Sequence, residues 1–73
     1  MTAIVGSTPN SIKEWAEANN VNDFKSITHV NHFSGLIPEK VIILSKAYSI
    51  RTFSQIMDYI QINNLRVENE CVL

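Results

Sequence analysis

Eight side chains that could hold a small ligand follow directly after three apolar runs of the chain. The runs are residues 2–6, 25–30 and 41–44, and the side chains that follow them carry hydroxyl, amide, imidazole, amine, guanidinium and phenol groups. Lysine and arginine bind phosphate or carboxylate through charge and paired hydrogen bonds. The set therefore predicts a site for a small anionic or nucleotide-like ligand. The candidates are Ser7, Thr8, Asn31, His32, Lys46, Tyr48, Ser49 and Arg51.

The stretch GSTPNSIKEW, residues 6–15, has a second interpretation. Glycine, serine, threonine and asparagine occur in ordinary turns between strands and helices. Thr8 followed by Pro9 is also a good cap with proline at the first helical position. Neither the dinucleotide pattern GxGxxG nor the phosphate-loop pattern GxxxxGK[ST] is present. The stretch is consistent with either a ligand cradle or a simple helix start.

The titratable residues do not form a catalytic or metal-binding pattern. The spacing of His29 and His32 does not bring the two imidazoles to one metal ion, and no set of cysteines or carboxylates accompanies them. No aspartate or glutamate stands at a predicted strand end, where a magnesium site would need one. His32 could exchange a proton near neutral pH, but nothing supplies a nucleophile beside it. We expect a protein without catalytic residues, metal or cofactor.

The apolar runs predict three strands. Residues 2–6 are β-branched and end in glycine, residues 25–30 alternate around Ile27 and Val30, and residues 41–44 are continuously apolar. A continuous run is typical of a strand that is covered on both faces, as in parallel sheets. The last residues, 66–73, fit either a short edge strand or a tail.

Two helices are predicted between the strands. Over residues 9–19 apolar side chains recur with helical spacing, including Trp15 in the expected core stripe, and Ser11 with Glu14 offers a second capping position. The sequence NNVND then ends the helix, because asparagine tolerates the left-handed conformation. Thr52 with Gln55 fits a capping box at the start of the second helix. A single helical turn is expected over residues 34–37.

This order of elements predicts an α/β fold with a parallel sheet. Right-handed crossovers place the first strand in the middle, giving the order 2-1-3 of a minimal Rossmann-like or flavodoxin-like domain. The first helix then covers one face, and the 31–40 connection with the second helix covers the other. Ligands of open α/β sheets bind at the carboxyl ends of the strands, where the eight candidates stand.

A second surface is predicted on the outer side of the second helix. With Phe53 taken as the centre of the core stripe and a turn of about 100° per residue, Tyr59 and Ile62 point away from the core, and Leu65, just past them, adds to the patch. They predict a contact surface for a partner, although single exposed apolar residues are also common. The interface candidates are Tyr59, Ile62 and Leu65.

Length and composition limit the class of protein. The 73 residues form one domain, 1–73, with 45% hydrophobic residues and a single cysteine, so no internal disulfide can form. Small domains usually need a disulfide, a metal or a partner chain, and we therefore expect a homo-oligomer, most simply a dimer. The net charge of −1 without a basic stripe argues against binding duplex nucleic acid. Without an apolar run of membrane length or a signal peptide, we expect a cytoplasmic protein with no membrane contact.

The layout from residue 3 to residue 62 resembles small Rossmann-like proteins of unassigned role that bacteriophages encode. The resemblance is carried by Gly6 after the first strand, Trp15-Ala16 in the first helix, Gly35-Leu36 before the third strand and the loop after VIIL. It implies an accessory protein that acts by binding a host protein or a nucleotide-like signal. Two functions follow as hypotheses: a self-associating interaction protein, or a protein that sequesters a phosphorylated small ligand. A small phosphate-handling enzyme is the third.

Overall fold

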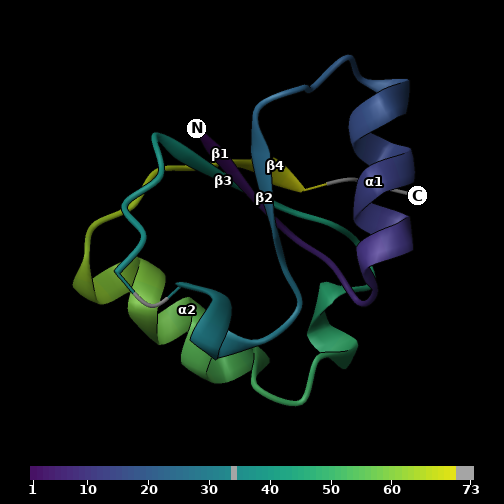
Figure 1. Cartoon of the computed structure of the whole chain (residues 1–73). Helices are drawn as coiled ribbons and strands as arrows, with labels where there is room; N and C mark the ends of the chain where they lie inside the picture. The colour runs from purple at the N-terminus through teal and green to yellow at the C-terminus, as the bar shows by residue number, and fades with distance from the viewer. Residues whose placement is uncertain (34, 71–73) are drawn as a thin grey trace.

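The apolar runs form one parallel sheet in the computed structural model, which describes residues 1–33 and 35–70 (Figure 1). The order is β2-β1-β3-β4, and each neighbouring pair is parallel. This confirms the predicted α/β class and the order 2-1-3, and it adds β4 at the edge beside β3. The strands are β1 (Thr2–Val5), β2 (Phe24–Ile27), β3 (Lys40–Ile43) and β4 (Val67–Glu70).

Helices α1 (Pro9–Ala18) and α2 (Phe53–Ile62) lie on opposite faces of the sheet, as predicted (Figure 1). Alternate residues of a strand point to opposite faces, so both sides of the central strands are apolar and buried. On the α1 side the buried cluster consists of Ile4, Ile12, Ala16, Ile42 and Leu44. On the α2 side it consists of Ala3, Val5, Ile27, Phe33, Val41, Ile43, Ala47, Ile56 and Ile60.

Both helices end in the same way, with a second asparagine in the left-handed conformation. Asn20 has φ 58° and Asn64 has φ 53°. The next residue in each case donates its N–H back to the helix, from Val21 to the Ala16 carbonyl at 2.8 Å and from Leu65 to Ile60 at 2.9 Å. This geometry is the Schellman motif. The helix stop predicted from NNVND is confirmed.

The two helix starts differ from each other. At α1 the Thr8 hydroxyl oxygen accepts a hydrogen bond from the Ser11 N–H at 3.1 Å, so the helix begins at Pro9 under a threonine cap. At α2 the predicted capping box of Thr52 with Gln55 is wrong, because Thr52 makes no side-chain cap bond. Its oxygen instead accepts a hydrogen bond from the Val30 N–H at 3.0 Å, across 22 residues of sequence. Thr52 therefore bonds to a residue that is distant in sequence, in place of the backbone of its own helix.

The second strand is shorter than predicted, since β2 ends at Ile27 and a 3-10 helix, η1 (Val30–Phe33), follows. Two imidazoles bind the backbone here: His32 Nδ1 accepts from the Thr28 N–H and His29 Nδ1 accepts from the Asn31 N–H, both at 3.1 Å. Side chains that bind nearby backbone groups compete with strand pairing. The helical turn expected at residues 34–37 lies earlier in the chain, and Ser34 is outside the described residues.

Gly6 allows a close approach at the end of β1. A Cβ atom at this position would lie 2.7 Å from Ile12 Cγ1 and 3.1 Å from Leu44 Cδ1. The first distance is too short for real carbon contacts, so only glycine lets β1 pass this close to α1 and to the end of β3. The close approach brings the start of α1 beside the segment that follows β3.

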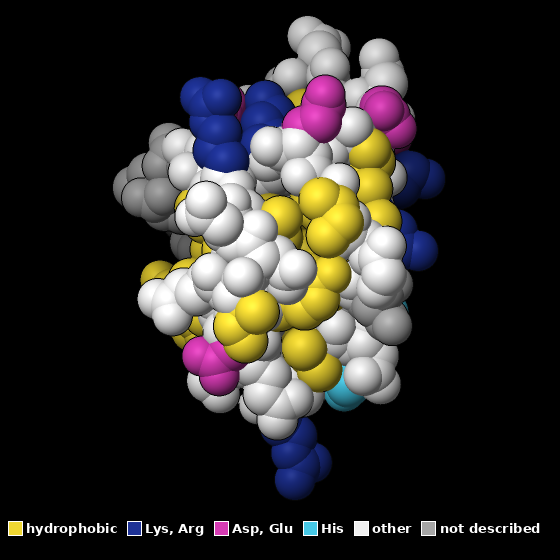
Figure 2. Space-filling model, turned by 90° about the vertical axis from the view of Figure 1, so that its left-hand side faces the viewer, with side chains coloured by type: hydrophobic (Ala, Val, Ile, Leu, Met, Phe, Trp, Pro, Cys, Tyr) yellow, Lys and Arg dark blue, Asp and Glu magenta, His cyan; other side chains and the backbone are white. Residues whose placement is uncertain are grey.

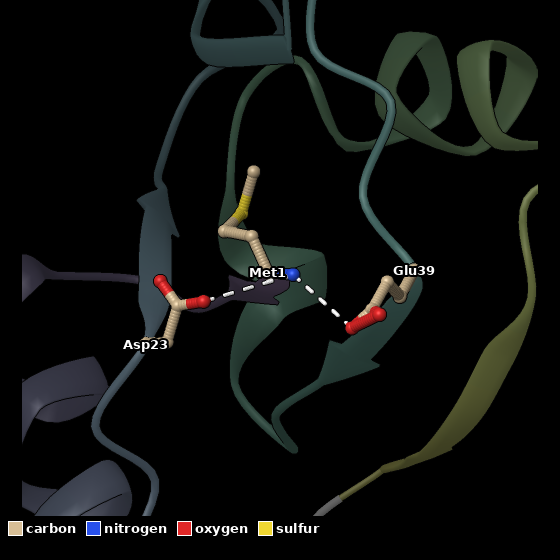
Figure 3. A network of polar contacts seen from close by, with 3 residues as sticks. All are labelled: Met1, Asp23 and Glu39. Atoms are coloured by element: carbon tan, nitrogen blue, oxygen red, sulfur yellow. Dashed lines mark hydrogen bonds and ion pairs between the residues drawn. The ribbon is translucent and has the colours of Figure 1, made fainter.

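At the amino ends of the strands, the amino group of Met1 lies between two carboxylates (Figure 3). Its nitrogen is 3.2 Å from Glu39 Oε2 and 3.8 Å from Asp23 Oδ2. The Glu39 N–H also donates to the Met1 carbonyl at 2.9 Å, and the Thr2 N–H donates to the Asp23 carbonyl at 3.1 Å. Because both carboxylates are exposed, we expect these ion pairs to contribute little to the stability of the fold.

The C-terminal segment contains an edge strand, one of the two alternatives predicted for residues 66–73. The strand β4 covers Val67–Glu70, with a register shift opposite Val41 and Ile42. Glu68 pairs with Lys40 Nζ at 3.2 Å and with Arg66 at 3.4 Å. Residues 71–73, including Cys71, lie outside the described residues.

Candidate functional site

The carboxyl ends of β1 and β3 leave the sheet side by side. Val5 is in register with Ile43, and the Leu44 N–H donates to the Val5 carbonyl at 2.9 Å. The segments that follow, residues 6–8 and 45–46, therefore start from adjacent points. This is the place where the sequence predicted a ligand site.

A cavity of about 570 Å³ opens beside these segments, along one side of α1. It lies on the α1 side of the sheet, because its lining combines one flank of that helix with the chain that follows β3. A volume of this order is typical of small-molecule sites, which span about 300–1,000 Å³. The lining residues are Ser7, Ser11, Glu14, Trp15, Ala18, Asn19, Leu44, Ser45 and Lys46.

Two of the eight predicted ligand residues line this cavity, namely Ser7 and Lys46. Thr8 stands next to it but is used by the helix cap: its oxygen accepts from the Ser11 N–H and its hydroxyl donates to Ser11 Oγ at 2.9 Å. The stretch GSTP is thus a capped helix start, and its contribution to the cavity comes through Ser7.

The charged groups of the cavity have no partners among the residues that the structure describes. Lys46 and Glu14 are both exposed, and the four ion pairs of this part of the chain involve neither. Trp15 is half-buried: it packs against the α1-side cluster and also lines the cavity. The expectation that Trp15 belongs to the core is therefore half correct.

The other predicted ligand residues lie away from the cavity. Asn31 and His32 belong to η1, and Tyr48 and Ser49 belong to a second 3-10 helix, η2 (Ala47–Ser49). Both 3-10 helices contribute buried residues to the cluster on the α2 side, Phe33 and Ala47. The bond from Val30 to Thr52 places η1 beside the turn that contains Arg51. The predicted set is thus divided between the two faces of the sheet.

Most of the residues on the α2 side have local roles. Ser49 Oγ donates to the Lys46 carbonyl at 2.8 Å. Tyr48 is 70% exposed, and its ring meets Phe53 edge-on with centroids 6.0 Å apart. The lining of the cavity beside α1 includes none of Tyr48, Ser49 and Arg51.

Most of the cavity residues that the sequence did not predict lie on one flank of α1, and the others, Leu44 and Ser45, follow β3. Ser11, Trp15 and Ala18 repeat at helical spacing, next to the buried stripe of Ile12 and Ala16. That repeat could have indicated the flank, because residues three and four apart share a helix face. The sequence could not show that the chain after β3 passes along it.

A second candidate surface lies on the α2 side, and we call it the apolar face. Ile62 is 82% exposed and Ile37 is 68% exposed. The half-buried residues Leu36, Tyr59 and Leu65 pack against the core cluster on the same side of the sheet. Figure 2 shows hydrophobic side chains gathered in a band on this side of the molecule, with charged side chains at its margins.

Of the predicted interface residues, Ile62 points outward as expected, but Tyr59 does not. Tyr59 stacks on Phe33 with ring centroids 5.0 Å apart, and its hydroxyl donates to the Leu36 carbonyl at 2.9 Å. Leu65 is also half-buried, because it closes the end of α2. The expected outward direction of Tyr59 is wrong, whereas a role at an interface stays a prediction for all three.

Comparison of the chain with protein-family models, with curated proteins and with solved structures finds no match. The fold is that of an α/β protein with a parallel sheet, with the order of a flavodoxin-like or Rossmann-like domain. In the described part of the chain, no group of three or more histidine, cysteine, aspartate or glutamate side chains could hold a metal ion. No helix of residues 1–33 and 35–70 has the length and hydrophobicity needed to cross a membrane.

Proposed function

We propose that this chain is a non-catalytic binding protein that associates with a second copy of itself through the apolar face. The observation that carries the proposal is the exposure of Ile62 and Ile37, two large aliphatic side chains on one side of a small domain. Leaving such a surface in water costs about 25 cal/mol for each Å² that a partner would cover.

The two side chains belong to one surface. The Tyr59 hydroxyl is bonded to the Leu36 carbonyl, so the connection before β3 lies against α2. Ile37 follows Leu36 directly, and Ile62 lies one helical turn beyond Tyr59. The band of hydrophobic side chains with charged margins (Figure 2) has the distribution of a protein interface, which is apolar at its centre and polar at its rim.

A second copy is the partner that this surface fits best. An apolar centre without charge does not repel itself when two copies meet about a twofold axis. A standard interface removes about 800 Å² from each partner, which is about one sixth of the 4717 Å² that this chain exposes. Burying an area of that size would add substantially to the stability of a domain of only 73 residues. An accessory role agrees with the resemblance to small phage-encoded α/β proteins.

Sedimentation equilibrium over a range of concentrations tests the proposal. The wild-type chain is expected to show twice the chain mass, and Ile62→Lys is expected to shift it to the monomer. Gln61→Lys is the matched control, since it adds the same charge to the neighbouring exposed position of α2. Neither variant should change the free energy of unfolding of the monomer by more than about 0.5 kcal/mol.

Two outcomes would contradict self-association. One is a wild-type chain that stays monomeric at every concentration, which would leave the apolar face to a different protein partner. The other is an equal shift in both variants, because a general effect of charge would then explain the change without the apolar face.

A further inference from the structure

The cavity beside α1 is a site that self-association does not use, since it lies on the other face of the sheet from the apolar face. Its lining contains a lysine, a glutamate, a tryptophan and three serines. The aromatic ring and the aliphatic Ala18 and Leu44 give it an apolar wall. Small-molecule sites have this composition, an apolar wall with a few polar groups that fix orientation.

The polar groups are distributed along the cavity in a definite order. Ser11, Trp15 and Asn19 stand at successive turns of α1, and eight residues of helix span about 12 Å. Ser7 and Lys46 are at the Ser11 end, because β1 and β3 end in register there. The site is thus elongated, with a cation and hydroxyls at one end and the indole ring in the middle.

We propose that this cavity binds a nucleoside 5′-monophosphate. The phosphate lies against Lys46 and the hydroxyls of Ser7 and Ser11, the base stacks on Trp15, and the ribose hydroxyls donate to Glu14. Each group suits its role: an ammonium binds phosphate strongly, indole stacks on any base, and a carboxylate accepts hydrogen bonds from hydroxyls.

The state of these groups in the structure supports the assignment. Lys46 and Glu14 have no ion-pair partner among the described residues, and the Ser7 hydroxyl makes no hydrogen bond within them. The Ser11 Oγ accepts from Thr8 and keeps its own proton to donate. Glu14 also disfavours a ligand that is anionic along its whole length. The cavity therefore selects a ligand whose anion, hydroxyls and ring are separated, rather than inorganic phosphate.

Intrinsic fluorescence gives a direct test, because Trp15 is the only tryptophan of the chain. The full chain is titrated with AMP, GMP, CMP and UMP, with the corresponding nucleosides, and with inorganic phosphate, under excitation at the red edge of indole absorption. At least one monophosphate is expected to change the Trp15 emission saturably. Its nucleoside and inorganic phosphate should each bind at least about tenfold more weakly, because the nucleoside lacks the phosphate that bonds to Lys46 and inorganic phosphate lacks the base that stacks on Trp15.

Matched variants locate the site. Lys46→Gln is expected to weaken the monophosphate about tenfold or more, while Lys13→Gln, which removes the same charge from an exposed position of α1 outside the lining, should leave the affinity unchanged. Glu14→Gln should weaken the ribonucleotide more than its 2′-deoxy form, and Glu17→Gln should affect neither.

The proposal is overturned if no monophosphate gives a saturable change up to millimolar concentration. It is also overturned if Lys13→Gln weakens binding as much as Lys46→Gln, because long-range charge and not the cavity would then account for the affinity. Either result leaves the measured mass of the chain, and therefore the self-association proposal, untouched.

Discussion

The Tyr59 hydroxyl donates a hydrogen bond to the carbonyl oxygen of Leu36 at 2.9 Å, and the same ring stacks on Phe33. The contact fastens α2 to the connection before β3 across 23 residues of sequence. We expect Tyr59→Phe to lower the free energy of unfolding by about 0.5–1.5 kcal/mol, because a partly buried carbonyl loses its donor while the ring stack remains. Urea unfolding measures the difference. A variant as stable as the wild type would show that water replaces the hydroxyl without cost.

Thr52 stabilises the fold through Val30 and not through the start of its own helix. Thr52→Val keeps the shape of the side chain and removes the oxygen, so the partly buried Val30 N–H loses its acceptor. The expected loss is about 1–3 kcal/mol of unfolding free energy. Gln55→Ala, at the predicted capping-box partner, should change it by less than about 0.5 kcal/mol. If Gln55→Ala proved the more damaging change, the local capping box would be the correct description.

Gly6 is required by close packing, whereas Gly35 is favoured by a backbone conformation that asparagine can also adopt. Gly6→Ala forces a Cβ against Ile12 and Leu44, and we expect a loss of about 1–3 kcal/mol from overpacking. Gly35 has φ 71° with open space around it, so Gly35→Asn should be tolerated, because asparagine adopts the left-handed conformation readily. Thermal unfolding of the two variants separates these causes. Equal melting temperatures would contradict the close approach at Gly6.

Substitution by glycine should change the stability in opposite directions at the two asparagines that follow α2, Asn63 and Asn64. Asn64 is in the left-handed conformation, so Asn64→Gly is expected to leave stability unchanged or raise it by up to about 1 kcal/mol. Asn63 has φ −92°, and its side chain donates to the Tyr59 carbonyl at 3.0 Å. Asn63→Gly should therefore lower stability, since glycine is disfavoured next to a helix turn with negative φ. Denaturant unfolding of the two variants gives the signs, and the same sign for both would contradict the cap geometry.

The sequence by itself determined the sheet order, the face that each helix covers and the residues that end the helices. These features depend on short-range patterns. Ala3, Ile4 and Val5 are all apolar and point alternately to the two faces of the sheet, so both faces must be covered. The right-handedness of the crossovers then leaves a single order for three strands. Asn20 ends its helix for a reason contained in the residue itself, its tolerance of positive φ.

Tertiary structure decided which side chains face one another. Placing the core stripe of α2 at Phe53 pointed Tyr59 outward, but the buried residues of the helix are Ile56 and Ile60. The centre of the stripe therefore lies about 40° away, which puts Tyr59 on its flank, about 80° from the centre, and leaves Ile62 about 140° from it. The helical period fixes relative angles only. The contacts of the helix with η1 and the sheet fix where the stripe points.

The candidate cavity shows the same division. Local sequence placed Ser7 and Lys46 after their strands, and the register of β1 with β3 brings them together. The flank of α1 that completes the cavity, with Glu14 and Trp15, could not be assigned from spacing, because it is defined by the path of a segment about 30 residues later in the chain. Long-range packing, which no local pattern encodes, sets that path.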